Sequence, residues 1–177
     1  TKTDLNDFYQ LYLYAFTNPD SAERRAFFDH RYQHSEKYGI KYDGRLGSGM
    51  LSIPFQVNFH GVKYKMNGIG DVMSYPEYGG HGAITKLMRQ AFQDMLANKV
   101  ASSYLAPFSY KFYRRFGYEE VFDQTIYRVK NTDLPRIRVD SQEGSMERLS
   151  LKDAIPYIKE LYNNNPDSHN AGLVRAD

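Results

Sequence analysis

The chain of 177 residues contains neither cysteine nor tryptophan. The absence of cysteine excludes disulfides and thiol chemistry and fits a reducing compartment, so we expect a cytoplasmic protein. No apolar run approaches the roughly 18 residues that a membrane-spanning helix requires. The first residues also lack a signal-peptide pattern, and we expect no membrane partner.

The chain also lacks a large excess of positive or negative charge. The formal net charge is +2, which is too small to indicate a nucleic-acid partner. The five histidines are scattered and none lies at metal-ligand spacing, so no metal is expected. With 41% hydrophobic residues, the chain can build the core of one domain with an appendage.

Glycine is concentrated at one place. Gly79, Gly80 and Gly82 follow Pro76, which ends a predicted strand, and precede apolar residues at helical spacing from Ile84 onward. The glycines therefore lie at a helix N-terminus, where free N–H groups and the helix dipole favour an anion such as phosphate. A plain strand-to-helix turn is the alternative. Neither the nucleotide P-loop nor the Gly-x-Gly-x-x-Gly motif is present.

The rest of the pattern predicts an antiparallel meander that leads into one long helix and then a crossover to a parallel strand. Before the glycines we expect helices over 4–16 and 22–36, a hairpin at 43–44, strands over 50–59 and 62–66, a turn at 67–68 and a strand over 72–75. After the long helix we expect a strand over 100–105, a short helix over 108–116, a strand over 121–129, a linker over 131–144 with a short strand at 137–139, a helix over 151–162 and an eleven-residue tail.

Two motifs together resemble a known family, the GNAT N-acetyltransferases. Residues 76–84 resemble the family's pyrophosphate loop, Arg/Gln-x-x-Gly-x-Gly/Ala, and residues 112–118 (Phe-Tyr-Arg-Arg-Phe-Gly-Tyr) resemble its late aromatic motif. The resemblance implies an α/β (α+β) fold: a mixed, mostly antiparallel central sheet with a splayed parallel strand pair, flanked by helices. It also implies that acetyl-CoA enters between the splayed strands and acetylates an amine.

Within that family, the chain most resembles the N-terminal domain of the Eis-like (enhanced intracellular survival) acetyltransferases. The resemblance implies a GNAT domain over 1–130 and a linker with a helix over 131–177 that opens a truncated second GNAT-like domain. It further implies a primary-amine acceptor, either a small molecule such as an aminoglycoside or polyamine, or a peptidyl lysine. A homo-oligomer is also implied, since Eis-like relatives form hexamers.

Residue by residue, the resemblance assigns roles at the site. Tyr113 becomes the general acid. The strand residues that bind pantetheine through their backbone are Val72, Met73 and Ser74, and Phe108 and Ser109 lie beside the pantetheine. The pyrophosphate is held by the residues of the glycine-rich segment and the start of the helix: Gly80, His81, Gly82, Ala83, Ile84 and Thr85. Gly79 departs from the usual Arg or Gln, and Ile84 from Gly or Ala. Lys86 and Arg89 either supply the missing charge or are solvated helix residues.

The general base has several candidates. Asp71 is the local one, because many GNAT enzymes place an acid on this strand, but burial must raise its pKa. The alternative is that Asp71 is an exposed charge at the end of the strand. The Eis-like relatives are thought to use the C-terminal carboxylate of the full chain. His60 and His81 are further candidates, whereas Glu77 more plausibly interacts with the helix dipole. Candidates to attract a cationic acceptor are Asp29, Glu36 and Asp43. A CoA-binding module without catalysis and an interaction domain without a cofactor remain alternatives.

Overall fold

The structure is a computed structural model that describes residues 2–123, 125–134, 147–165 and 170–175. The chain divides into two units, one formed by Thr1–Phe108 with Pro166–Asp177 and the other by Ser109–Asn165. The first unit holds α1 (Lys2–Ala15), α2 (Ala22–Gln33), β1 (Glu36–Tyr42), β2 (Arg45–Phe59), β3 (Val62–Ser74), the 3₁₀ turn η1 (Pro76–Tyr78), α3 (Ala83–Ala97), β4 (Ser102–Tyr104) and β5 (Asn170–Leu173). The second holds α4 (Tyr110–Arg114), η2 (Asn131–Asp133) and α5 (Leu151–Asn164).

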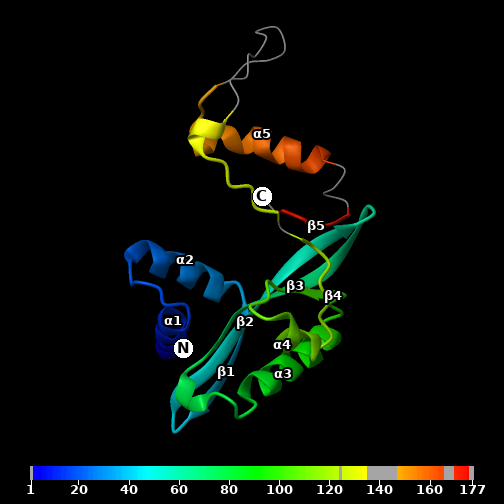
Figure 1. The fold of residues 1–177 in the computed structure, drawn as a ribbon. Helices are drawn as coiled ribbons and strands as arrows, with labels where there is room; N and C mark the ends of the chain where they lie inside the picture. The colour runs from blue at the N-terminus through cyan, green and yellow to red at the C-terminus, as the bar shows by residue number, and fades with distance from the viewer. Residues whose placement is uncertain (1, 124, 135–146, 166–169, 176–177) are drawn as a thin grey trace. The chain divides into compact units, whose positions relative to one another are not determined.

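One sheet organises the first unit (Figure 1). Its strands follow the order β1-β2-β3-β4, and β5 joins the free stretch of β2. The β1–β2, β2–β3 and β2–β5 pairs are antiparallel, whereas β3 and β4 are parallel. The helix α3 makes the crossover between the parallel strands. The predicted mixed, mostly antiparallel sheet with one parallel pair is therefore confirmed.

The helices α1 and α2 cover one face of this sheet (Figure 1). Seven buried side chains form the core there: Phe8, Tyr9, Leu11, Phe28, Leu46, Leu51 and Met73. Glycine makes this packing possible, because a Cβ on Gly39 or Gly49 would lie 3.2 or 2.8 Å from the Phe8 ring. The aromatic ring of α1 thus rests directly on the backbone of β1 and β2.

The other face of the sheet carries α3 (Figure 1). Its buried residues recur at three- and four-residue spacing, as the sequence predicts: Ala83, Leu87, Met88, Ala91 and Met95. The Tyr38 hydroxyl on β1 donates a 2.8 Å hydrogen bond to Asp94 on α3. Burial and this bond raise the pKa of Tyr38, so the hydroxyl stays protonated and fixes the helix to the sheet.

Local signals in the sequence predict several boundaries correctly. Ser21 is the N-cap of α2, and its hydroxyl accepts a hydrogen bond from the Arg24 N–H. The predicted turn at 43–44 joins β1 to β2, and the turn at 60–61 joins β2 to β3. All four turn residues have positive φ, the conformation that glycine adopts without strain.

The predicted turn at Asn67–Gly68 is wrong, because β3 runs without interruption from Val62 to Ser74. An Asn-Gly pair normally indicates a hairpin. Here the Asn67 amide is buried and donates a 2.9 Å hydrogen bond to Ser52 on the neighbouring strand. Gly68 lies under the ring of Phe55, where a Cβ would come within 3.0 Å. Cross-strand packing thus overrides the local preference.

Two other predictions fail near the C-terminus. The described residues of 121–129 form no strand, and their apolar side chains, including Ile126 and Tyr127, are exposed. Alternation alone does not make a strand, because a strand also needs a neighbour with which to pair. The predicted tail contains β5, since Val57 to Phe59 offer it a free edge. The strand predicted at 137–139 lies outside the described residues.

Candidate functional site

The parallel strands β3 and β4 pair only briefly. Their register joins Met66 to Ser102, Asn67 to Ser103 and Gly68 to Tyr104. The strand β4 then ends, whereas β3 continues to Ser74. Within the described residues, the edge of β3 from Ile69 onward therefore faces no paired strand. This is the predicted splay, and it leaves backbone groups of Val72 to Ser74 for a ligand that lies along the strand.

The strand β3 contains a β-bulge within this free stretch. Gly70 pairs with Leu51 and Met73 with Gly49, so two residues of β3, Asp71 and Val72, oppose a single residue of β2. Asp71 adopts the left-handed conformation, with φ of 49°. The extra residue re-aims the side chains, and the Asp71 carboxylate meets Arg31 of α2.

The Asp71 carboxylate is buried, with 7% of its side chain exposed. Arg31 Nη2 lies 2.8 Å from Oδ2. Neither atom meets the geometry of a hydrogen bond, so the contact is an ion pair without a directed N–H. Burial raises the pKa of Asp71 to about 6, and the charge of Arg31 opposes that rise. A carboxylate with a pKa near 6 is a better proton acceptor at neutral pH than a solvated one.

This burial predicts a pH effect on stability. Because the pKa of Asp71 is about 6 in the folded chain and ordinarily 3.8, the folded state binds the proton more tightly. The resulting stabilisation is complete below the ordinary pKa and is lost as the pH rises through the folded one. Relative to Asp71→Asn, the wild type should gain about 2 kcal/mol of unfolding free energy between about pH 7.5 and about pH 4.5. Urea unfolding of both proteins measures it; a constant difference would contradict the raised pKa.

The end of β3 is anchored to β2. The Ser74 and Ser48 hydroxyls lie 2.8 Å apart, and the Tyr75 N–H donates a 2.9 Å hydrogen bond to the Gly47 carbonyl. The rings of Tyr42 and Tyr78 stack 4.3 Å apart, over Gly47, where a Cβ would lie 2.5 Å from either ring. These contacts fix η1 against the β1–β2 hairpin. They therefore also fix the start of the segment that follows η1, residues 79–82, which we call the glycine turn.

The glycine turn joins η1 to α3. Gly80 and Gly82 have φ of 77° and 74°, and a Cβ at either position would meet no atom within 4 Å. Gly82 is the N-cap of α3, and no side chain caps the helix. The first helical hydrogen bond runs from the Lys86 N–H to the Gly82 carbonyl. The N–H groups of the preceding first turn therefore lack an intrahelical partner, which fits a phosphate group approaching over bare glycine.

Tyr113 lies on α4, in the second unit, whereas Asp71 and the glycine turn lie in the first. The Ser109 hydroxyl caps α4 by accepting a hydrogen bond from the Phe112 N–H. Tyr113 is buried and its ring packs edge-on against Phe112 and Tyr118. Burial raises its pKa, so the hydroxyl stays protonated at neutral pH. Phe108 is exposed.

Of the other charged candidates, His81 lies in the glycine turn, whereas His60, Asp29 and Asp43 lie elsewhere. His60 occupies the β2–β3 turn, at the end of β3 opposite the glycine turn, so it cannot be the base there. Asp29 pairs with Arg25 on its own helix, and Asp43 lies in the β1–β2 turn. Sequence patterns did not single out Arg31, because no local signal links a residue of α2 to a bulge forty residues away.

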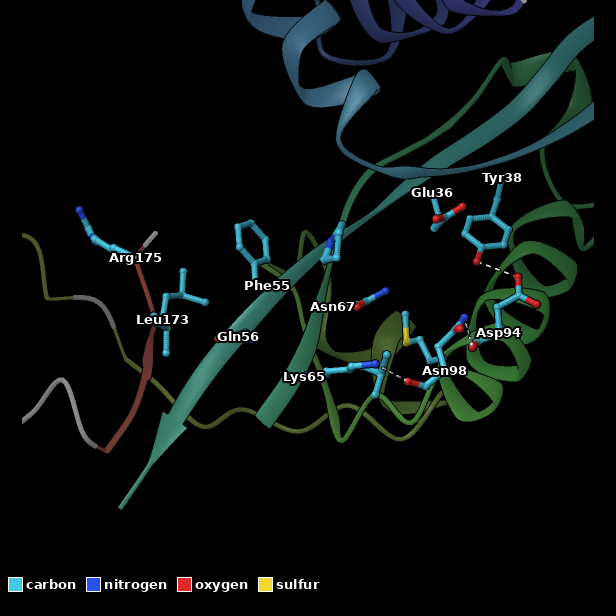
Figure 2. A pocket seen from close by; sticks show the side chains of 14 residues that line it. Glu36, Tyr38, Phe55, Gln56, Lys65, Asn67, Asp94, Asn98, Leu173 and Arg175 are labelled. Atoms are coloured by element: carbon cyan, nitrogen blue, oxygen red, sulfur yellow. Dashed lines mark hydrogen bonds between the residues drawn. The ribbon is translucent and has the colours of Figure 1, made fainter. Parts of the chain in front are cut away.

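Among the hollows beside the sheet, two bear on the site. The larger, of about 950 Å³, lies between β1–β3 and the C-terminal end of α3 and is lined by Glu36, Tyr38 and Asp94 among others (Figure 2). Glu36, a candidate to attract a cationic acceptor, lines this hollow, whereas Asp71, Tyr113 and the residues predicted to bind CoA are not among its lining residues. A second hollow, of about 830 Å³, is lined by residues after α1, such as Thr17 and Asn18, and by Val72 to Ser74. This second hollow adjoins the free edge of β3.

In the described part of the chain, no three histidine or acidic side chains gather as metal ligands. Among the same residues, no helix has the length and hydropathy needed to cross a membrane.

Comparisons with known proteins bear on this arrangement. A model of the acetyltransferase (GNAT) domain matches residues 1–121. No curated protein matches the chain. A solved structure from Enterococcus faecalis, a conserved protein of unknown function and probable N-acyltransferase, is 43% identical with a TM-score of 0.91 and covers 99% of this chain.

More distant structures share the fold. A GCN5-related N-acetyltransferase from Kribbella flavida is 24% identical with a TM-score of 0.61, over 67% of this chain and 31% of its own. An Eis protein from Mycobacterium abscessus is 17% identical with a TM-score of 0.57, over 67% of this chain and 30% of its own. The chain spans 44% of the length of the Enterococcus faecalis protein.

Proposed function

The chain belongs to the GNAT acetyltransferase family, and from this premise we propose that it transfers an acetyl group from acetyl-CoA to a primary amine. The observation that carries the proposal is the course of β3: it leaves β4 at Gly68, carries a buried carboxylate at a bulge, and leads into the glycine turn. We propose that this one continuous segment supplies an edge for pantetheine, an anion site for the pyrophosphate and, at the bulge, a proton acceptor.

Acetyl transfer has three chemical requirements that the protein must meet. The attacking amine must lose a proton, the tetrahedral oxyanion needs a hydrogen-bond donor, and the departing thiolate needs a proton or a strong hydrogen bond. Asp71 is our candidate to accept the proton of the amine. For the second we propose a backbone N–H at the bulge, since the ladder with β2 is interrupted there. Tyr113 is the candidate for the third.

The role of Tyr113 predicts a simple result. Tyr113→Phe keeps the ring that packs against Phe112 and Tyr118 but removes the hydroxyl. We expect turnover to fall at least about tenfold, while acetyl-CoA binding stays unchanged. Steady-state kinetics and calorimetry measure the two quantities. The matched control is Tyr118→Phe, which removes the hydroxyl of a neighbouring tyrosine in the same motif. If Tyr113→Phe keeps normal turnover, Tyr113 has no role in the mechanism.

The acceptor class and the branch of the family are also proposals. The glycine turn and the aromatic motif support an Eis-like protein, whose acceptor would be an aminoglycoside-like polycation, a polyamine or a lysine. The hollow beside Val72 to Ser74 is the place we propose for that amine, because it adjoins the free strand edge. The remaining length of the related protein leaves room for the second GNAT-like domain that we expect.

One observation favours a second candidate, a CoA-binding module without catalysis. Gly79 stands where the family usually has Arg or Gln, so a side-chain hydrogen-bond donor that would contact the pyrophosphate is missing. The buried carboxylate of Asp71 favours the enzyme instead, because a module that only binds CoA does not need a proton acceptor. The two candidates differ in one result: a binding module binds acetyl-CoA and acetylates no amine.

A further inference from the structure

Arg31 and Asp71 form an ion pair between α2 and the bulge of β3. The guanidinium is not free to follow the carboxylate, because it lies over three aromatic rings: its central carbon is 5.4 Å from the centroid of Tyr12, 5.1 Å from that of Phe27 and 5.8 Å from that of Phe28. The pair is therefore a built contact between two elements rather than a pair of mobile surface charges.

We propose that Arg31 is a positioning residue for acetyl transfer, which holds the Asp71 carboxylate at the bulge and favours its charged form. This inference rests on the proposed function, in which Asp71 accepts the proton of the amine. Arg31 itself touches neither the amine nor the acetyl group in this proposal; it acts through Asp71.

Two opposing effects set the protonation of the Asp71 carboxyl. Burial disfavours the charged carboxylate, and the positive charge of Arg31 at 2.8 Å favours it. Without Arg31, burial would act unopposed and a larger fraction of Asp71 would be protonated at neutral pH. With a fully aligned, hydrogen-bonded pair, the carboxylate would be a poor base. With Arg31 in place, the carboxylate lies between these limits, because burial and the ion pair act on it in opposite directions.

The surroundings of Asp71 make Arg31 the group to test. Of the described residues, Arg31 is the charged group that acts on the Asp71 carboxyl. The neighbouring elements contribute uncharged side chains at this point: Tyr12 from α1 and Phe27 and Phe28 from α2, all around the guanidinium. The next carboxylate on α2, Asp29, is engaged by Arg25.

The test compares Arg31→Gln with Arg25→Gln. Arg25 lies on the same helix, pairs with Asp29 at 2.8 Å and stacks on Tyr9, so it is a second arginine of α2 with a carboxylate partner and an aromatic contact, but its partner is not Asp71. The pH profile of kcat/KM is measured for both variants and the wild type with one polyamine acceptor, so that the titration of the amine cancels in the ratio to wild type.

We expect Arg31→Gln to move the acid limb of the profile upward by at least about one pH unit, because an opposite charge at this distance typically shifts a carboxyl pKa by about 1–3 units. At about pH 6 its kcat/KM should be about fivefold below wild type or lower, and the ratio should recover toward one at high pH. Arg31→Lys should restore the limb in part, and Arg25→Gln should leave it in place.

Titration of the Asp71 carboxyl by carbon-detected NMR gives a second readout that does not depend on turnover. An upward shift of that titration in Arg31→Gln, together with the shifted kinetic limb, supports the proposal. An unmoved carboxyl titration overturns it. A moved titration with an unmoved kinetic limb also overturns it, and removes Asp71 as the base while acetyl transfer itself stands. If no amine is acetylated, the proposed function fails and the carboxyl titration alone decides whether Arg31 controls Asp71.

Discussion

Asp71→Asn is expected to lower kcat/KM for acetyl transfer by roughly 10²–10⁴-fold, the range that a positioned general base contributes. Asparagine keeps the size of the side chain but cannot accept the proton. The loss should persist at high pH, because a neutral amide does not recover its function when the pH rises. The acid limb near pH 6 should disappear from the residual activity, since the pKa of about 6 belongs to the carboxyl that has been removed.

Two controls keep this result specific. Asp29→Asn removes a carboxylate that also pairs with an arginine of α2 but lies away from the bulge, and it should leave turnover near the wild-type level. Calorimetry should show that Asp71→Asn still binds acetyl-CoA, because the glycine turn does not depend on the carboxylate. Full turnover in Asp71→Asn, with the acid limb preserved, would transfer the role of base to another group, such as the C-terminal carboxylate of the longer relatives.

Gly82→Glu is expected to abolish acetyl-CoA binding. The new side chain would begin at a position that now meets no atom within 4 Å, and it would place a negative charge at the N-terminus of α3, where the pyrophosphate is proposed to lie. In the wild type, acetyl-CoA at about 100 times its Kd should stabilise the fold by about 2.7 kcal/mol, which corresponds to a rise in Tm of about 5–10 °C. The variant should lose this rise.

The backbone provides a matched control for that substitution. Gly61, in the β2–β3 turn, has φ of 86°, close to the 74° of Gly82, and a Cβ there also meets no atom within 4 Å. Gly61→Glu therefore adds the same charge and comparable backbone strain at the far end of β3. It should melt at a similar temperature to Gly82→Glu without ligand and keep the full rise with acetyl-CoA. An equal rise in both variants would remove the glycine turn from the binding site.

Much of the fold could be predicted from local sequence. Ser21 marks the start of α2. The two-residue turns at 43–44 and 60–61 each end in glycine, which adopts positive φ without strain, and each turn joins two long strands. The apolar spacing after Ile84 predicts α3, and the helix between two strands predicts the parallel pair. These features depend on a few neighbouring residues, which is why the sequence reveals them.

The features that a sequence pattern could not predict depend on distant contacts. The Asn67–Gly68 pair indicates a turn until Ser52 and Phe55 are brought across from β2. The bulge at Asp71 is a mismatch of register between two strands, and neither strand encodes it alone. The burial that raises the pKa of Asp71, and the charge of Arg31 that opposes it, come from a helix forty residues earlier.

The most direct test of acetyl transfer is to incubate the protein with acetyl-CoA and a panel of three amines, a polyamine, an aminoglycoside and a lysine peptide, and to measure both free CoA thiol and acetylated amine by mass spectrometry. We expect thiol release that depends on the amine, one acetylated product that matches it in amount, and loss of both in Asp71→Asn. Stabilisation by acetyl-CoA without any acetylated amine would contradict the enzyme and leave the CoA-binding module in its place.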